Sequence, residues 1–319
     1  MTDYLDLDDK LTEEERNIRD TARQFITEEL KPELGGMFER GEFPDWVIPK
    51  FGELGFYAPN LEGYGLSNIS ERGYGVLMTE IEAGDSGLRS MASVQGALVM
   101  YPIWKFGSDA QKEKYLPKMG KGELVGCFGL TEPDQGSDPA SMRCRAEADG
   151  DGWKLYGEKT WITNAPIADV ALVWARDMSD GETIRGFLVD CDKDGVETHP
   201  IHEKHSMRVS HTGSVVCDGV HVTEEDVLPE VRGMKGPLSC LTQARYGIAW
   251  GAIGAARDAY EEALEYGQDR EQWGRPIAGF QLQQEKFTEM ITQISLAQLL
   301  ADRLSELKEA GKLRPQQVS

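Results

Sequence analysis

The stretch Phe128-Gly129-Leu130-Thr131-Glu132-Pro133-Asp134-Gln135-Gly136-Ser137-Asp138 follows a short apolar run, residues 124–130, and turns through a proline and a glycine. Glycine allows a close approach of the backbone, and the hydroxyls of Thr131 and Ser137 add donors to the free N–H groups of the turn. Such a loop suits an anionic ligand or one with many acceptors. The same residues are also typical of an ordinary acidic surface turn. The rest of the chain has to decide between these two interpretations.

The residues before this loop, up to about Gly122, have helical periodicity. Thr12 and Glu15 form a capping-box pattern, which predicts a helix that begins there and ends at Lys31-Pro32. Further helices are expected over residues 45–54, 70–83 and 90–106 and from residue 108 onward, with Gly55 capping the first of these.

From about residue 124, short apolar runs alternate with Asp-Gly turn signals. The expected strands cover residues 125–130, 143–148, 153–156, 170–175, 185–189, 214–217 and 220–222, and a turn is expected at residues 157–159. Short strands without intervening helices predict an antiparallel, barrel-like or sandwich domain.

Helical periodicity returns at about residue 238 and continues to 266, where residues 268–270 interrupt it, and a last helix is expected over residues 281–310. Gly247, Gly251 and Gly254 lie on or near one face of the long helix, so another helix can approach closely there. The predicted fold is therefore α+β, with an N-terminal helical domain over residues 1–123, an antiparallel β-barrel-like domain over 124–235 and an incomplete C-terminal helical bundle over 236–319.

Composition excludes several classes of partner. The 319 residues contain 34 Lys and Arg against 55 Asp and Glu, a net charge of -21. Nucleic acid and anionic membranes are polyanions, so neither is an expected partner. The acidic start of the chain lacks a signal-peptide pattern and no apolar run is long enough to span a membrane, so a cytoplasmic location is expected. The dispersed acidity also suits a surface adapted to high salt.

Metal and disulfide chemistry have little support in the sequence. The five cysteines are odd in number and no two have Cys-x-x-Cys spacing, which favours reduced, structural thiols. His199, His202 and His205 lack the spacing of usual structural zinc sites. No metal site is therefore predicted.

Three further positions each have a structural and a functional interpretation. Trp161, with Thr163 nearby, is either a buried strand residue or an aromatic wall for a flat heterocycle. Arg270 is either a solvated turn residue or a phosphate clamp. Arg89, seven residues after Glu82, is either part of an exposed ion pair or a reader of a substrate carboxylate that Glu82 holds in place.

Taken together, Phe128–Ser137, Trp161-Ile162-Thr163, residues 244–251 (Ala-Arg-Tyr-Gly-Ile-Ala-Trp-Gly) and residues 269–274 (Asp-Arg-Glu-Gln-Trp-Gly) with Gln281 resemble the acyl-CoA dehydrogenases, which are FAD flavoproteins. The likeness covers essentially the whole chain. Residues 85–95 and 244–251 are most similar to the glutaryl-CoA dehydrogenase branch. Trp273 departs from the Phe that is usual in the family.

The resemblance implies roles for particular residues. The flavin would be held by Phe128, Leu130, Thr131, Gly136, Ser137, Trp161, Ile162 and Thr163, with Arg270 and Gln281 reaching the FAD of a neighbouring subunit. The acyl-CoA would contact Arg89, Ser90, Ser93, Ser137, Leu241, Arg245 and Tyr246, and Arg89 would face the far carboxylate of a glutaryl chain. An electron-transferring flavoprotein as acceptor and a homotetramer are implied as well.

The family's catalytic base is absent from these residues. The usual glutamate lies in a Tyr-Glu-Gly-Thr-like segment that does not occur in this chain, and the alternative position, before the arginine of Ala-Arg-Tyr-Gly, is Ala244. We therefore expect a chain truncated before its base, which would lie beyond Ser319. Glutaryl-CoA oxidation with decarboxylation is the expected function of the family type. Oxidation of another short acyl-CoA and a non-catalytic fragment remain as alternatives.

Overall fold

The computed structural model describes residues 3–319 and divides into two compact units, each assembled from separate stretches of the chain. The first, called here the helical unit, comprises Met1–Gly35, Ser70–Arg89 and Arg245–Ser319. The second, called the sheet unit, comprises Gly36–Ile69 and Ser90–Ala244. The division into three consecutive domains, with boundaries at residues 123 and 235, stays a prediction. The two compact units are defined by contacts between residues, and each combines stretches that are not consecutive in the chain.

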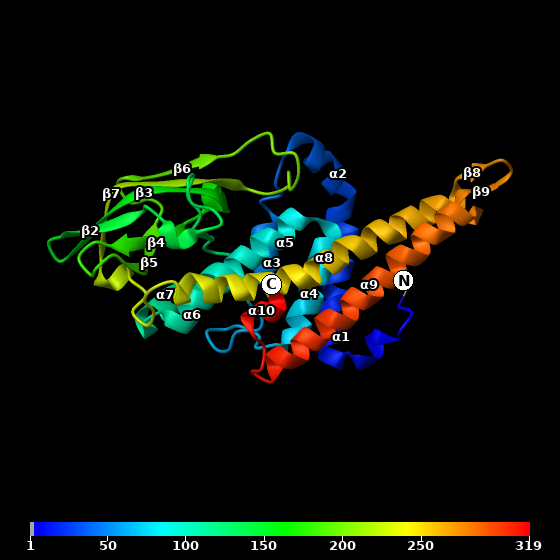
Figure 1. The fold of residues 1–319 in the computed structure, drawn as a ribbon, viewed down its shortest axis with the longest axis horizontal. Coiled ribbons are helices and arrows are strands. Elements are labelled where there is room, and N and C mark those ends of the chain that lie inside the picture. The colour runs from blue at the N-terminus through cyan, green and yellow to red at the C-terminus, as the bar shows by residue number, and fades with distance from the viewer. Residues whose placement is uncertain (1–2) are drawn as a thin grey trace. The chain divides into compact units, whose positions relative to one another are not determined.

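The helices and the small hairpin can be followed along the chain in Figure 1. The α-helices are α1 Glu13–Phe25, α2 Lys31–Arg40, α3 Val47–Glu53, α4 Glu71–Gly84, α5 Ser86–Ser93, α6 Tyr101–Phe106, α7 Asp109–Gly120, α8 Lys235–Asp269, α9 Gln281–Glu309 and α10 Pro315–Val318. Two π-helical segments are η2 Ile26–Leu30 and η3 Val94–Met100, and the 3-10 turns are η1 Leu7–Lys10, η4 Pro139–Ser141, η5 Ala165–Ile167, η6 Glu224–Asp226 and η7 Ile277–Gly279. Among residues 3–319 no helix is both long and apolar enough to cross a bilayer.

The start of α1 confirms the predicted capping box. The Glu15 amide donates to Thr12 Oγ1 over 3.2 Å, and the Thr12 amide donates to Glu15 Oε2 over 2.8 Å. Each side chain thus satisfies a backbone donor that the first turn of a helix leaves without a partner.

The prediction that this helix ends at Lys31-Pro32 is wrong. Helical structure continues through η2 into α2, and the Lys31 amide donates to Ile26 O, five residues back. Proline lacks an N–H and its ring clashes with the carbonyl four residues earlier in an α-helix. The wider π turn moves that carbonyl away and accommodates the ring. The same device precedes Pro102, where the Tyr101 amide donates to Gly96 O at the end of η3. That helical stretch also begins at Ser86, four residues before the predicted start.

The glycines of α8 pack against α4 inside the helical unit, as the sequence predicted for an unspecified partner helix. A Cβ at Gly254 would lie 1.9 Å from Thr79 O, and one at Gly251 would lie 1.9 Å from Glu82 Oε2. A larger side chain at Gly254 would require the backbone of α4 to move, and one at Gly251 would displace the Glu82 carboxylate. Helix α9 lies along the second half of α8, with the rings of Tyr260 and Phe287 6.0 Å apart, and the hairpin of β8 Glu271–Gln272 and β9 Arg275–Pro276 joins the two helices (Figure 1).

The sheet unit contains a seven-stranded sheet. Its strands are β1 Gly126–Gly129, β2 Arg145–Asp149, β3 Gly152–Thr163, β4 Val170–Asp177, β5 Thr183–Asp190, β6 Val196–Pro200 and β7 Thr212–Thr223, in the order β1-β4-β2-β3-β7-β6 with β5 paired to β4. The prediction of a purely antiparallel sheet is wrong, because β1 and β2 both run parallel to β4. Strand β6 was missed: its side chains are half-buried or exposed and give no apolar run.

Two expected turns lie inside strands. The turn predicted at residues 157–159 is part of β3, and one of the Asp-Gly turn signals, Asp218-Gly219 between the expected strands 214–217 and 220–222, lies within β7. Gly219 is the extra residue of a bulge, since Tyr156 pairs with Asp218 while Leu155 pairs with Val220, and its φ of 72° is the conformation that glycine adopts most readily. A buried apolar core fills the inside of this curled sheet; it contains Cys127, Trp153, Val173, Phe187 and Val215, among others.

Candidate functional site

The loop after β1 is held in place from its start by a buried glutamine in the sheet unit. Gln95, on η3, is 1% exposed. Its Oε1 accepts from the Gly126 amide over 2.7 Å, and its Nε2 donates to Leu124 O over 2.7 Å and to Met119 O over 3.2 Å. The beginning of β1 is therefore fixed by hydrogen bonds that satisfy both ends of the amide side chain.

The loop itself presents its polar end to the solvent. Glu132 and Gln135 exchange backbone hydrogen bonds of 3.1 and 3.2 Å and close a tight turn. Beyond it, Gly136 and Ser137 are exposed, and a Cβ at Gly136 would meet nothing within 4 Å. Thr131 is half-buried at the base of the turn. The predicted turn is therefore present, and binding of a ligand by its hydroxyls and exposed backbone stays a prediction.

The structure places the predicted Trp161 segment directly beside this loop. The Thr160 amide of β3 donates to Thr131 O over 2.9 Å. Trp161 has a φ of 58° and lies at an irregularity where the β3–β7 register shifts between Lys159 and Ile162, and its side chain is 63% exposed. The buried interpretation of Trp161 is therefore wrong. A left-handed backbone at a bulky residue is uncommon, and such outliers concentrate at functional sites.

The remaining predicted flavin-binding residues divide by burial. Phe128, Leu130 and Ile162 are buried, at 7%, 5% and 4% exposed, and their contact with a flavin stays a prediction. Phe128 packs edge-on against Trp174 with the ring centroids 6.3 Å apart. Thr163 is half-buried at the end of β3.

In the helical unit, Arg89 and Glu82 form a buried ion pair. Arg89 on α5 is 7% exposed and Glu82 on α4 is 8% exposed. The Arg89 Nε donates to Glu82 Oε2 over 2.6 Å, and the Ser86 hydroxyl donates to Glu82 Oε1 over 2.8 Å. The interpretation of this pair as exposed is wrong, because α8 closes over it at Gly251. Ser90 and Ser93, on the same helix α5, are buried residues of the sheet unit.

The predicted acyl-CoA residues on α8 have different environments. Leu241 is half-buried, Arg245 is exposed, and Ala244 is 6% exposed. Tyr246 is fully buried in the helical unit, where its hydroxyl donates to Glu71 O over 2.9 Å and its ring stacks on Tyr74. The ring of Tyr246 therefore packs inside the unit, and its contact with a substrate stays a prediction.

Arg270 and Gln281 flank the hairpin that joins α8 to α9. Both side chains are exposed. Between them Trp273 is 88% exposed, with its ring edge-on to Phe280 at 5.7 Å, and the Arg275 guanidinium lies 3.9 Å from the centroid of the Phe280 ring. The predicted contact of this hairpin with the flavin of another subunit stays a prediction.

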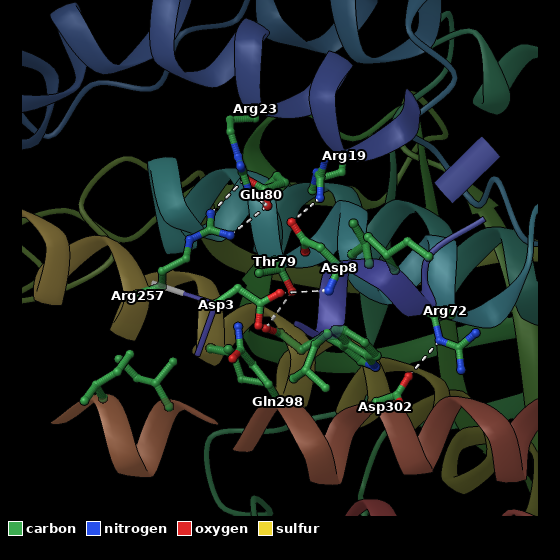
Figure 2. Close-up of a pocket in the computed structure, with 17 residues that line it drawn as sticks. Asp3, Asp8, Arg19, Arg23, Arg72, Thr79, Glu80, Arg257, Gln298 and Asp302 are labelled. Atoms are coloured by element: carbon green, nitrogen blue, oxygen red, sulfur yellow. Dashed lines mark hydrogen bonds and ion pairs between the residues drawn. The ribbon is translucent and has the colours of Figure 1, made fainter. Parts of the chain in front are cut away.

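A small cavity of about 80 Å³, lined by both apolar and charged side chains, lies elsewhere in the helical unit, between α1, α4, α8 and α9 (Figure 2). Its charged side chains pair with one another. Glu80 binds both Arg23 and Arg257 through two contacts each, at 2.8–3.0 Å, and Arg72 binds Asp302 over 2.7 Å. Burial alone would raise the pKa of Glu80, but the hydrogen bonds and charges of Arg257 and Arg23 hold it below its ordinary value. The acidic and basic side chains that line this cavity balance one another, and none of its lining residues is a predicted site residue.

The thiols are structural in character. Cys127, Cys144, Cys217 and Cys240 are buried, and burial raises the pKa of Cys217 to about 12. Such thiols stay protonated and are poor nucleophiles. Within residues 3–319 no group of three or more His, Cys, Asp or Glu side chains is placed to hold a metal ion.

Sequence reasoning missed two buried charged residues, Glu132 in the loop and Lys159 on the neighbouring strand β3. They form an ion pair of 2.8 Å and are 5% and 1% exposed. Their separation of 27 residues gives no local signal, and a charged residue in a turn or a strand normally reads as exposed.

Comparison with known proteins identifies the family of the chain. Residues 12–123, 127–220 and 231–319 match the models of the N-terminal, middle and C-terminal domains of acyl-CoA dehydrogenases. The chain is 34% identical over 312 residues to a 3-(aryl)acrylate reductase of Clostridium sporogenes (strain ATCC 15579), covering 97% of this chain and 83% of that protein. It is 32% identical over 315 residues to a glutaryl-CoA dehydrogenase of Desulfococcus multivorans, covering 96% of this chain and 81% of that protein.

Among solved structures, a glutaryl-CoA dehydrogenase from Mycobacterium smegmatis in complex with FADH2 superposes with a TM-score of 0.96 at 45% identity, covering 99% of this chain and 81% of the other. Enzymes of this family are flavin-dependent oxidoreductases that act on CH–CH bonds, with FAD as the cofactor. On the match to all three domain models and to these relatives, the chain belongs to the acyl-CoA dehydrogenase family.

Proposed function

We propose that this chain binds FAD and a short acyl-CoA, and that its substrate is glutaryl-CoA, which is oxidised and decarboxylated to crotonyl-CoA. The observation that supports this substrate is the buried Arg89–Glu82 pair. A guanidinium that is held in place and shielded from water suits recognition of a planar carboxylate. The 45% identity to a glutaryl-CoA dehydrogenase of known structure favours the same substrate.

The sheet unit fits a flavin. Trp161 offers an exposed aromatic face, and the hydroxyls of Thr131 and Thr163 lie on segments that the Thr160 hydrogen bond joins. The exposed backbone at Gly136 and Ser137 adds room for a polar ligand. A left-handed backbone at Trp161 costs about 1–3 kcal/mol. Strain of this size persists at functional sites, and here it would place the ring against the flavin. When bound, FAD would supply the acceptor for a hydride from the substrate β-carbon.

The residues of this chain would bind and orient the reactants. Trp161 would flank the flavin ring, with Thr131 and Thr163 donating hydrogen bonds to it, and Ser137 would lie near the substrate. Arg89 would hold the far carboxylate of the glutaryl chain and so keep the β-carbon, which is to be oxidised, at the flavin. An electron-transferring flavoprotein as acceptor and a homo-oligomer with Arg270 and Gln281 at a subunit contact belong to the same proposal.

The base for α-proton abstraction is not assigned. The position before Arg245 holds Ala244, which has no proton acceptor.

Binding rather than turnover tests the substrate most directly. Glutaryl-CoA and butyryl-CoA are titrated into FAD-loaded protein while the flavin absorbance is followed. We expect Arg89→Ala to weaken glutaryl-CoA by about 2–5 kcal/mol and butyryl-CoA far less, since only glutaryl-CoA then has a buried carboxylate without a partner.

Arg23→Ala is the matched control, because Arg23 also pairs with a buried glutamate of the helical unit but has no proposed substrate contact. It should change both affinities alike. Equal losses for the two acyl-CoAs in Arg89→Ala would overturn the carboxylate role and favour another short acyl-CoA. Purified protein without yellow flavin, and without affinity for added FAD, would favour a non-catalytic fragment.

A further inference from the structure

The ion pair of Lys159 and Glu132 is a feature of the sheet unit that the proposed chemistry does not use. Lys159, on β3, is 1% exposed, and Glu132, in the loop after β1, is 5% exposed. Lysine and glutamate are almost never buried to this extent unless they are paired. The two residues lie on the two segments that carry the proposed flavin contacts.

The hydrogen bonds of this pair connect the loop with β3 and with the start of β2. Lys159 Nζ donates to Glu132 Oε1 over 2.8 Å and to Leu130 O over 3.1 Å. Glu132 also accepts from the amides of Arg143 over 2.6 Å and Cys144 over 2.8 Å. Burial alone would raise the pKa of Glu132, but these amides and the Lys159 charge hold it below its ordinary value. The carboxylate therefore joins the loop, the start of β2 and β3.

The pair sits between the two halves of the candidate flavin surface. Lys159 is the last residue of β3 before the irregularity that turns Trp161 outward, and the next amide, that of Thr160, donates to Thr131 O. Leu130 and Glu132, which Lys159 contacts, flank Thr131. The positions of Thr131 and Trp161 relative to one another thus depend on where Lys159 is held.

A buried ion pair contributes little net stability, because desolvation of both ions offsets their attraction. What such a pair does provide is a single geometry, since any other arrangement leaves a charge unpaired. We propose that Lys159 and Glu132 are positioning residues that hold the loop and the Trp161 segment in the flavin-binding arrangement before FAD is present. This inference rests on the proposed function.

Two matched single variants test it. Lys159→Met removes the cation but leaves Glu132 its two amide donors. Arg185→Met removes the cation of another buried pair in the same sheet, where Asp177 keeps its donors from Ser179 and Trp153. The contacts of Arg185 are with Asp177, Glu224 and Trp153, none of which lies in the candidate site.

The affinity for FAD is measured by quenching of flavin fluorescence, and stability by thermal unfolding of the FAD-free proteins. We expect both variants to lose stability, and only Lys159→Met to raise the Kd for FAD by about tenfold or more, which corresponds to about 1.4 kcal/mol. An Arg185→Met variant that weakens FAD as much as Lys159→Met overturns the inference, as does a folded Lys159→Met variant with unchanged affinity.

Amide hydrogen exchange on the wild-type chain decides the matter even where Lys159→Met does not fold. The amides of Arg143, Cys144 and Thr160 should be protected from exchange both with and without FAD, because the Lys159–Glu132 pair orders these segments before FAD binds. Protection that arises only after FAD is added overturns the inference. A wild-type chain that binds no FAD overturns the proposed function and this inference together, whereas wild-type binding with equal losses in the two variants overturns this inference alone.

Discussion

At the scale of a single residue, Trp161 is the most unusual position of the candidate site. Its backbone is in the left-handed region and its ring is 63% exposed, so neither backbone preference nor burial explains the residue. Both are unfavourable for a bulky aromatic side chain at an irregularity of a strand. A planar ligand that covers the ring would account for both.

Replacing Trp161 should therefore separate folding from binding. We expect Trp161→Gly to leave the unfolding free energy of the FAD-free protein unchanged or to raise it by up to about 1–2 kcal/mol, because glycine relieves the left-handed strain. The same variant should weaken FAD binding, whereas Trp161→Phe should retain most of the affinity. Urea unfolding and FAD titration measure the two quantities, and a glycine variant that binds FAD like the wild type would remove Trp161 from the site.

At the scale of the element, the Glu80 carboxylate joins three helices, α1, α4 and α8. Glu80 on α4 is 2% exposed and accepts from Arg23 on α1 and Arg257 on α8. Removing one member of such a group leaves buried charges without compensation. Figure 2 shows Glu80 between the two arginines.

The lowered pKa of Glu80 fixes the sign of a pH effect. A carboxyl whose pKa falls on folding contributes stability above its unfolded value, near 4.5, and loses that contribution as the pH falls through the lower folded value. We expect Glu80→Gln to cost about 3–5 kcal/mol at pH 7. The difference from the wild type should shrink as the pH is lowered below 4.5.

Urea unfolding of both proteins across this pH range provides the measurement. Glu28→Gln, at an exposed position of the same helical unit, is the control and should show little change at any pH. A difference between Glu80→Gln and the wild type that stays constant down to the acid transition would contradict the assignment.

At the scale of the whole molecule, the dominant property is charge. With 55 acidic against 34 basic residues, the chain carries a net charge of -21, and like charges repel in the folded state. Salt shortens the range of this repulsion from about 10 Å at 0.1 M to about 3 Å at 1 M. We therefore expect the unfolding free energy to rise with ionic strength.

The rise should exceed about 1 kcal/mol between 0.1 and 1 M salt, which is more than the uncertainty of a linear extrapolation from urea. Comparing NaCl with NaClO₄ at equal ionic strength separates screening, which is the same for both, from effects of the particular anion. Stability that falls with NaCl would contradict an interpretation based on self-repulsion.

Features that depend on residues close in the chain were predictable. The capping box of Thr12 and Glu15 spans three residues, and both partners can be read from the sequence. The position of Gly251 and Gly254 on one face of α8 follows from helical spacing alone. The loop at residues 128–138 was recognisable because glycine, proline and hydroxyl residues occur together there. In each case the chemistry is contained in one turn or one loop.

The tertiary structure decided what depends on distant residues. That α4 packs against the glycines, that β1 runs parallel to β4, and that Lys159 reaches Glu132 all join segments separated by tens of residues. The π turn before Pro32 also needed the structure, since proline by itself predicts a helix end. By itself the sequence determined the succession of a helical part, a β part and a second helical part, and the turn at residues 128–138. Only the tertiary structure could bury Arg89 and Lys159 beside their carboxylates, because a charge loses its water only when several distant segments close around it.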